Sequence, residues 1–431
     1  MSRNRFLIDS FFLSGGVAVS QVMSLAALPI YSWLYTPEEF GALTLYISII
    51  SILMVFSTLR FEQAIVLPES KEDARNVLNA VLGISSVFSL VTLGLLLSGV
   101  LDALGYGGSF ELYRYFVPMN ILVGGVAAGF RYWFIREGKF HIVGLGVILS
   151  TGSSILITVL LGYFLPDEYR VLGLISGRVF QDVVFASFVL ARYLLDNPRS
   201  GRIRPRLVYE SIVGYRYLIG TLVSSHGISS LYLQLPKLAI SFIYGNTALG
   251  YYGLAERMVG VPSMLVSNAI GEVYRQRSAK SWNEVGSFVD NYLSTIKYML
   301  LLGIPVYVVA FLFAPDLISY VLGASWSDSG RFAQILLVGG AVGFVSTAVD
   351  KGALIVGAYK YIFWWHSLKF VTKLVVVGVI YILGVSIETM IMSIVAVRIV
   401  FYVVDLYVEY VFSKGQSHGV TKRIADLQGV S

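Results

Sequence analysis

Residues 140–164 read FHIVGLGVILSTGSSILITVLLGYF, a stretch without a single Asp, Glu, Lys or Arg. An α-helix needs about 20 consecutive apolar residues to cross the hydrocarbon core of a bilayer, so this stretch is long enough to span one. Because unpaired backbone groups have no partner in hydrocarbon, a spanning segment of this kind is helical. We therefore predict a membrane-spanning helix over 140–164.

The same pattern recurs along the whole chain of 431 residues, which is 56% hydrophobic and 13% charged. Soluble proteins carry about 25% charged residues, so this composition excludes a soluble enzyme, a nucleic-acid binder and a fibrous protein. Within the predicted span 211–243, Pro236 predicts a kink or break. Twelve spans are predicted, over residues 7–34, 41–67, 76–98, 112–135, 140–164, 171–194, 211–243, 249–274, 291–313, 331–356, 362–383 and 388–411.

The sequence lacks several features that enzymes use. It contains no cysteine, and its four histidines do not fall at a metal-ligand spacing, so neither a disulfide nor a histidine-built metal site is expected. No GxxxxGK[ST] stretch is present for ATP binding. The longest expected connections, about 196–210 and 314–330, are too short for a catalytic domain. We predict a transporter with no catalytic residue and no cofactor.

Basic residues between the spans predict the orientation of the chain. With a cytoplasmic N-terminus, the outside loops hold no Lys or Arg except at their edges, whereas the inside segments hold 18 of 32. The positive-inside rule then places both termini in the cytoplasm. The inside residues are Arg3, Arg5, Lys71, Arg75, Arg136, Lys139, Arg192, Arg199, Arg202, Arg204, Arg206, Arg275, Arg277, Lys280, Lys360, Lys414, Lys422 and Arg423.

Similar sequence features recur in the two halves of the chain. Three landmarks recur in order at offsets of 209, 219 and 220 residues, namely Gly41 with Gly250, Gly138 with Gly357, and Arg178 with Arg398. Six spans per half give both halves the same orientation, which is typical of parallel repeats related by an axis along the membrane normal. We predict an all-α membrane protein of two six-helix bundles, 1–195 and 211–411, joined by a basic cytoplasmic linker, 196–210, and followed by a cytoplasmic tail, 412–431.

A charged residue within a membrane span costs free energy unless it pairs with an opposite charge or faces water. The basic ones outnumber the acidic ones, which favours a cationic cavity between the bundles and an anionic cargo, because guanidinium and ammonium groups form charge-assisted hydrogen bonds with phosphate. Six basic residues are candidates to line this cavity: Arg60, Lys237, Arg257, Lys351, Lys373 and Arg398.

Three aspartates, Asp182, Asp350 and Asp405, are candidates for coupling to a proton or another cation. Structural pairing is the alternative in each case. Asp182 lies four residues after Arg178, so the two can pair along one helix face. Asp350 and Lys351 are adjacent and are expected to find partners on other helices. Lys369 either holds an anion together with Lys373 or extends to the membrane surface.

Four motifs, in this order, resemble those of bacterial polysaccharide repeat-unit flippases of the O-antigen and capsule type, within the multidrug/oligosaccharidyl-lipid/polysaccharide exporter (MOP) superfamily. The resemblance covers nearly the whole chain. The motifs are LYTPEEFG (Leu34–Gly41), LRFEQAIVLP (Leu59–Pro68), REGK (Arg136–Lys139) and LGASWSDSG (Leu322–Gly330).

The resemblance implies a flippase in the bacterial inner membrane. It would move undecaprenyl-diphosphate-linked oligosaccharides from the cytoplasmic to the periplasmic leaflet by alternating access, with a proton or sodium gradient as a possible coupling force. Expected partners are the lipid-linked oligosaccharide, membrane lipids, a polysaccharide polymerase and a chain-length regulator, and no nucleic acid. The first span lacks a basic residue in its core, unlike relatives that flip the peptidoglycan precursor, which argues against that cargo.

Three alternatives differ from this prediction. A cation-coupled multidrug exporter of the same superfamily should have an acidic rather than a basic excess within its spans. A membrane polymerase or ligase should have a large outer loop. A sugar uniporter of the major facilitator type should have G-x-x-x-D-[RK]-x-G after its second span, where this chain reads PESKEDAR (Pro68–Arg75).

Overall fold

The computed structural model describes residues 3–98, 112–197 and 204–415, and throughout these residues it contains helices and turns but no strand. The chain divides into two compact units, Met1–Gln234 and Leu235–Ser431, which are described separately. Parts of the predicted linker (198–203) and tail (416–431) lie outside the described residues. The basic residues Arg199, Arg202, Lys422 and Arg423 lie outside them as well.

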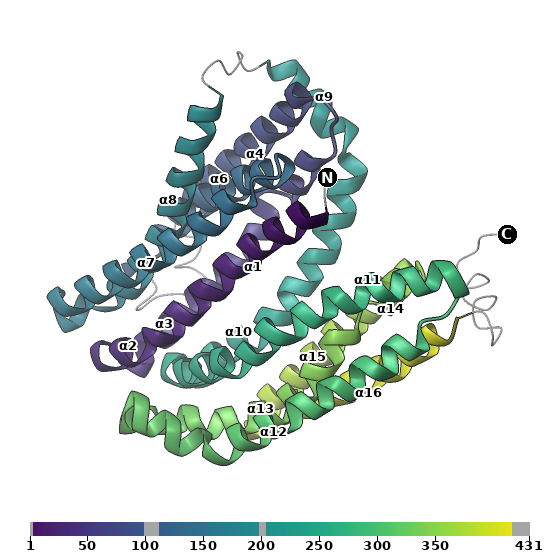
Figure 1. Cartoon of the computed structure of the whole chain (residues 1–431). Coiled ribbons are helices and arrows are strands. Elements are labelled where there is room, and N and C mark those ends of the chain that lie inside the picture. The colour runs from purple at the N-terminus through teal and green to yellow at the C-terminus, as the bar shows by residue number, and fades with distance from the viewer. Residues whose placement is uncertain (1–2, 99–111, 198–203, 416–431) are drawn as a thin grey trace. The chain divides into compact units, whose positions relative to one another are not determined.

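In the first unit, α7 packs along α8 and α1, while α4 packs along α6 (Figure 1). Phe134 and Trp133 of α6 are almost fully buried in the core between these helices. The elements are α1 (Arg3–Ala26), α2 (Leu28–Leu34), α3 (Pro37–Ser57), η1 (Phe61–Val66), α4 (Lys71–Leu97), α6 (Phe116–Arg136), α7 (Phe140–Phe164), η3 (Asp167–Tyr169), α8 (Val171–Asp196), α9 (Pro205–Gly214) and the first part of α10 (Arg216–Pro262).

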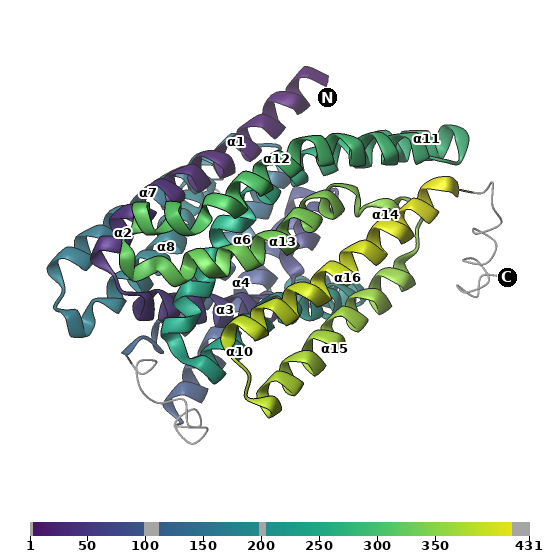
Figure 2. The same cartoon turned by 90° about the horizontal axis from the view of Figure 1, so that it is seen from below.

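In the second unit, α13 packs on both α12 and α16, and α15 lies alongside α16 (Figure 2). Its elements are the remainder of α10, η4 (Ser263–Ser267), α11 (Asn268–Val285), α12 (Val289–Leu322), η5 (Ala324–Trp326), α13 (Ser327–Val349), α14 (Gly352–Ile355), α15 (Tyr359–Leu383) and α16 (Ile387–Lys414).

Nine helices among the described residues are long and apolar enough to cross a membrane, so the chain is a multi-pass membrane protein. The segment 140–164, from which the fold was predicted, is α7 with the same bounds. The nine cover residues 15–34, 37–57, 71–97, 140–164, 167–196, 289–322, 324–355, 360–383 and 387–414.

The TPEE part of the first motif is the start of α3. Thr36 is the N-cap: its hydroxyl oxygen accepts a hydrogen bond from the Glu39 backbone N–H at 3.3 Å, and its own backbone N–H donates to the Glu39 carboxylate at 2.7 Å. Pro37 occupies the first turn, where its missing N–H costs nothing. This part of the motif is therefore a capping box that starts α3.

The REGK motif forms the tight turn between α6 and α7. Arg136 Nη2 donates to the backbone carbonyls of residues 68, 69 and 70 at 3.0–3.2 Å. Gly138 has φ of 70°, a conformation that disfavours a Cβ. Lys139 Nζ lies 2.7 Å from Asp196 Oδ2 at the end of α8, and this hydrogen bond raises the pKa of Lys139. The motif thus links α6 and α7 to the start of α4 and to α8.

The predicted connection 314–330 is wrong in length, because α12 continues through Pro315 to Leu322 and a new helical turn starts at Ala324. The LGASWSDSG motif reverses the chain at Gly323, where φ is 98°. Trp326 is completely buried, and a Cβ on Gly330 would lie 2.6 Å from Pro315 Cα, so only glycine allows this close approach.

A single break divides α10. The backbone leaves helical values at Gly245, with φ 85° and ψ 178°, whereas the residues around Pro236 keep helical values. Of the kink or break predicted at Pro236, the break lies instead nine residues further on, at Gly245. Proline removes one backbone donor but keeps a helical φ, whereas the extended conformation at Gly245 is essentially restricted to glycine.

Candidate functional site

The break in α10 brings together charges that a straight helix would separate. Lys237 and Glu256 are 19 residues apart, which corresponds to about 28 Å along a continuous helix. Lys237 Nζ nevertheless lies 2.8 Å from Glu256 Oε2. The chain reverses at Gly245, so the two arms of α10 face each other across this ion pair.

Two further cations join this pair from other helices. Lys373 of α15 is 3% exposed, and the charges of Arg398, Glu256 and Lys237 all act on its ammonium group. Arg398 of α16 and Glu256 also act on the buried hydroxyl of Tyr252. Lys237, Glu256, Lys373 and Arg398 form a group that we call the basic cluster. It holds three of the six candidate cavity residues.

Arg257 follows Glu256 in the second arm of α10. Consecutive residues of an α-helix point about 100° apart, and Arg257 is exposed where Glu256 faces Lys237. Arg257, although next to Glu256 in the sequence, therefore does not lie on the helix face through which Glu256 joins the basic cluster.

Asp405 is the partner of Lys369. Lys369 Nζ lies 2.5 Å from Asp405 Oδ2, and the indole N–H of Trp365 donates to the other carboxylate oxygen. The ammonium group also lies 5.3 Å from the Trp365 ring centroid. Both charged side chains are largely buried. The anion beside Lys369 is thus supplied by the protein itself, one helical turn from Lys373.

Asp350 and Lys351 pair with each other, with Lys351 Nζ 2.8 Å from Asp350 Oδ1. The prediction that these neighbours must find partners on other helices is wrong. It assumed that both belong to one helix, but α13 ends at Val349 and α14 begins at Gly352, so the intervening backbone turns the two side chains toward each other.

In the first unit, Asp182 pairs with Arg178 as predicted from their spacing, with Arg178 Nη1 3.0 Å from Asp182 Oδ1. The second carboxylate oxygen accepts a hydrogen bond from Asn120 Nδ2, also at 3.0 Å. Asn120 is fully buried on α6. The pair therefore cross-links α8 to α6.

Arg60 lies outside any α-helix, although the sequence placed it within a span. Helix α3 ends at Ser57, and both Leu59 and Arg60 have positive φ, at 51° and 55°. Arg60 Nη1 lies 3.5 Å from Glu62 Oε1, and Nη2 lies 3.1 Å from Nδ1 of His226 in α10. Glu62 is 2% exposed, so this turn carries a buried acid and a half-buried base.

Two features of these sites were absent from the predicted set. Gly245 carried no signal beyond its place between two expected spans. Glu409 of α16 is buried, and its Oε1 accepts a hydrogen bond from the backbone N–H of Ala353, with 3.4 Å between the nitrogen and the oxygen. Among the described residues, no group of three or more His, Asp and Glu is placed to hold a metal ion.

The comparisons with known proteins agree with this architecture. The sequence pattern of the family described as polysaccharide biosynthesis protein matches residues 30–331. Comparison with curated proteins finds no match. The fold is similar to that of the lipid II flippase MurJ in its inward closed conformation, with a TM-score of 0.69 and 13% identity over 97% of this chain and 93% of that one.

Two other solved structures are also similar. An inward-facing multidrug resistance MATE family transporter of the MOP superfamily has a TM-score of 0.64 and 18% identity, over 98% of this chain and 96% of that one. A MOP superfamily transporter from Pyrococcus furiosus has a TM-score of 0.62 and 17% identity, over 99% and 96%. At these identities the likeness shows the fold. The family pattern matches more than half of this chain. The chain therefore belongs to the polysaccharide biosynthesis protein family, and it has the fold of MOP superfamily transporters.

Proposed function

We propose that this protein is a flippase that moves undecaprenyl-diphosphate-linked oligosaccharide repeat units from the cytoplasmic to the periplasmic leaflet. It would do so by alternating access through a cationic central cavity, for O-antigen, capsule or exopolysaccharide assembly. The observation that carries the proposal is the basic cluster of Lys237, Lys373 and Arg398 around one carboxylate, in a chain of the polysaccharide biosynthesis family. Charge-assisted hydrogen bonds from such groups compensate the desolvation of a diphosphate.

The proposed transporter has twelve spans in two parallel six-helix bundles, 1–195 and 211–411, with both termini in the cytoplasm and the chain in the bacterial inner membrane. A local feature supports the duplication. Gly138 and Gly357 have φ of 70° and 77°, and each lies two residues before the start of a helix, Phe140 for α7 and Tyr359 for α15. Equivalent turns at corresponding places in the two halves, here 219 residues apart, are what a repeat predicts.

The proposed cycle needs a driving force and no cofactor. Asp182, Asp350 and Asp405 each form an ion pair with a basic residue. Protonation of such an aspartate would release its basic partner, which gives a proton gradient a route to change the helix contacts. A polysaccharide polymerase and a chain-length regulator are the proposed partners that receive the repeat units.

A cation-coupled multidrug exporter is the second candidate, because one of the similar folds is a multidrug resistance MATE transporter. The two candidates differ in the charge of the cargo. A cationic drug would be repelled by a site in which basic side chains outnumber acidic ones, whereas a diphosphate would be attracted.

The test uses proteoliposomes that contain fluorescent undecaprenyl-diphosphate oligosaccharide, with loss of label from one leaflet as the signal. Arg398→Gln and Lys237→Gln should each lower the translocation rate by about 10- to 100-fold, as expected for a lost charge-assisted hydrogen bond. Lys280→Gln, on an exposed residue of α11, serves as the matched control and should leave the rate unchanged. No translocation of several oligosaccharides, together with proton-linked efflux of a cationic dye, would instead establish the drug exporter.

A further inference from the structure

The imidazole of His226 connects α10 to the turn that follows α3, and both elements lie in the first unit. Its Nδ1 lies 3.1 Å from Arg60 Nη2, and its Nε2 lies 3.4 Å from Nε2 of the Gln63 side-chain amide. One helical turn further along α10, Ser230 Oγ donates a hydrogen bond to the carbonyl oxygen of Ser51 at 3.1 Å. The imidazole is thus the group of α10 that both polar side chains of the turn contact.

The contact with Arg60 requires a neutral imidazole. A guanidinium group only donates hydrogen bonds, and it keeps its charge in proteins. Nδ1 of His226 must therefore accept, so the neutral ring carries its hydrogen on Nε2. The Gln63 amide can present its oxygen to that hydrogen, because amide oxygen and nitrogen exchange places by a flip of the group. The Gln63 contact therefore suits either charge state of the ring, and the Arg60 contact suits only the neutral one.

Protonation of His226 would break the contact with Arg60. A protonated ring carries a hydrogen on both nitrogens, so an N–H group would face another donor and two positive charges would lie about 3 Å apart. Helix α3 reaches this part of α10 through Ser51 and Phe56, which carry no charge. The titratable and charged groups near the ring are Arg60 and Glu62 of the turn, with Tyr132 and Arg131 of α6 beside them. A protonated His226 and Arg60 would therefore compete for the Glu62 carboxylate.

The turn already holds the groups for a second arrangement of Arg60. The ion pair in this structure joins Arg60 Nη1 to Glu62 Oε1 at 3.5 Å. Arg60 Nε and Glu62 Oε2 are buried, and within the part of the chain that the structure describes neither forms a hydrogen bond. A guanidinium that leaves His226 can engage both carboxylate oxygens, which is the strongest geometry for such a pair. Loss of one contact is thus compensated by another only two residues away.

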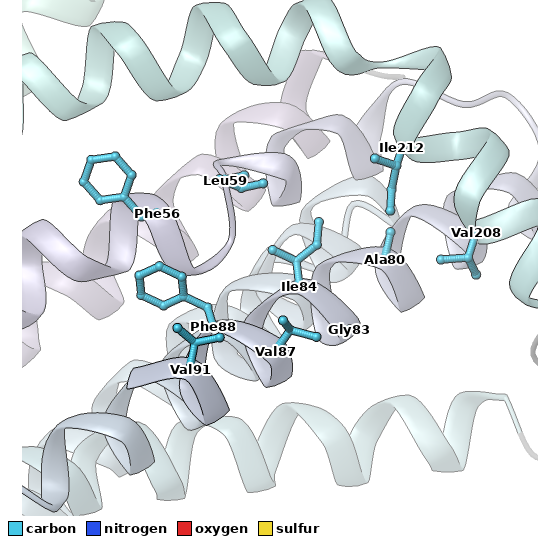
Figure 3. Close-up of a pocket in the computed structure, with 10 residues that line it drawn as sticks. All are labelled: Phe56, Leu59, Ala80, Gly83, Ile84, Val87, Phe88, Val91, Val208 and Ile212. Carbon is cyan, nitrogen blue, oxygen red and sulfur yellow. The ribbon is translucent and has the colours of Figure 1, made fainter. Parts of the chain in front are cut away.

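The backbone of the turn is strained and has open space beside it. Leu59 and Arg60 have φ of 51° and 55°, a conformation that non-glycine residues keep only where the surroundings hold it. Leu59 lines a cavity of about 550 Å³ between α3, α4 and α9, with Phe56 and Phe88 next to it (Figure 3). The turn can therefore shift on this side without displacing a neighbouring side chain, once its contact with α10 is lost.

We infer that His226 is a proton-binding site, and that its protonation releases the turn from α10 and directs Arg60 to Glu62. The inference goes beyond the proposed function, because it concerns contacts within the first unit and assumes no cargo. It also differs from the coupling proposed for the aspartates. There a proton neutralises an acid and frees its basic partner, whereas here a proton charges a base and repels a second base.

The test measures the distance between two spin labels in the full chain, reconstituted in lipid nanodiscs. The labels are attached at Val66→Cys in η1 and Thr221→Cys in α10, two exposed positions in a chain without native cysteine. A change from pH 8 to pH 5 crosses the ordinary histidine pKa of about 6.5. We expect the ratio of molecules with the pH 8 distance to those with a new distance to fall about tenfold or more, as for the loss of one charge-assisted hydrogen bond.

Two substitutions of His226 should fix the turn in opposite states. His226→Asn places an amide oxygen near the position of Nδ1 and takes up no proton, so it should keep the pH 8 distance at pH 5. His226→Arg carries a permanent charge and should give the pH 5 distance already at pH 8. His141 of α7 is the other histidine of the first unit, and His141→Gln is the matched control that should leave the pH response unchanged.

A distance distribution that stays the same from pH 8 to pH 5 would overturn the inference, and so would a pH response that persists in His226→Asn. A His226→Arg protein that folds and keeps the pH 8 distance would overturn it as well. A purely structural role of His226 predicts that Asn and Arg both disturb the turn at pH 8. No cargo enters the measurement, so its outcome is independent of whether the chain translocates lipid-linked oligosaccharides.

Discussion

The contact between Lys237 and Glu256 shows how one ion pair in a membrane protein depends on both partners. The two side chains are 17% and 31% exposed and their charged atoms are 2.8 Å apart. Removing one member of a largely buried pair leaves the other charge without compensation, which costs more than removing both. The basic cluster therefore combines a structural contact with the positive charge that we propose for cargo binding.

This gives a prediction for stability. Lys237→Gln should lower the free energy of unfolding by about 1–3 kcal/mol, because the Glu256 carboxylate loses its counter-ion. The double variant Lys237→Gln/Glu256→Gln should recover part of that loss. Thermal unfolding in detergent measures both. A double variant that is less stable than Lys237→Gln would show that Glu256 stabilises the protein through other contacts.

A second residue-scale prediction concerns Lys139, which lies in the turn outside the spans. Its hydrogen bond with Asp196 raises its pKa, so the folded protein favours the charged form. The stabilisation of the folded protein by this hydrogen bond is fully present below the ordinary lysine pKa of about 10.4. It is lost as the pH rises through the raised pKa of Lys139 in the folded protein. Lys139→Gln should therefore lower the unfolding temperature equally at pH 6 and pH 8. A penalty that disappears between these two pH values would contradict this assignment.

At the scale of elements, the decisive feature is the break in α10 at Gly245. Its φ of 85° and ψ of 178° lie in a region that L-residues avoid, although a Cβ there would touch no other atom. The constraint is thus in the backbone and not in the packing. It sets the angle between two arms that carry Lys237 and Glu256 of the basic cluster.

Gly245→Ala should destabilise the protein by about 1–3 kcal/mol through this backbone strain. Gly378→Ala is the control, because Gly378 lies within α15, also has open space around it, and should gain up to about 1 kcal/mol from better helix propensity. Unfolding temperatures of the two variants in detergent give the comparison. An unchanged or raised value for Gly245→Ala would show that the break does not need glycine.

At the scale of the whole molecule, the orientation predicted from the basic residues can be tested without interference, because the chain contains no cysteine. The Lys280 side chain on α11 is 76% exposed and the Asp328 side chain at the start of α13 is 46% exposed, and the two residues belong to opposite sides in the predicted topology. In intact cells, an impermeant maleimide should label Asp328→Cys and should reach Lys280→Cys only after lysis. The reverse pattern would invert the orientation and, with it, the proposed direction of transport.

Sequence alone was enough to determine that this is a multi-pass helical membrane protein and to recognise its family. Both conclusions depend on local properties, namely apolar stretches long enough to cross a bilayer and short motifs such as the Thr36 capping box and the REGK turn. The Arg178–Asp182 pair was predictable for the same reason, because one helix carries both residues.

Tertiary structure decided which distant charges meet. The pairs Lys237–Glu256 and Lys369–Asp405 join residues 19 and 36 positions apart, and the Asp350–Lys351 contact depends on where α13 ends. Hydropathy and spacing show that a charge lies within a span, but its partner is set by chain reversals such as that at Gly245 and by the packing of α15 on α16. A buried charge takes its role from the groups around it, and only the folded chain brings those groups together.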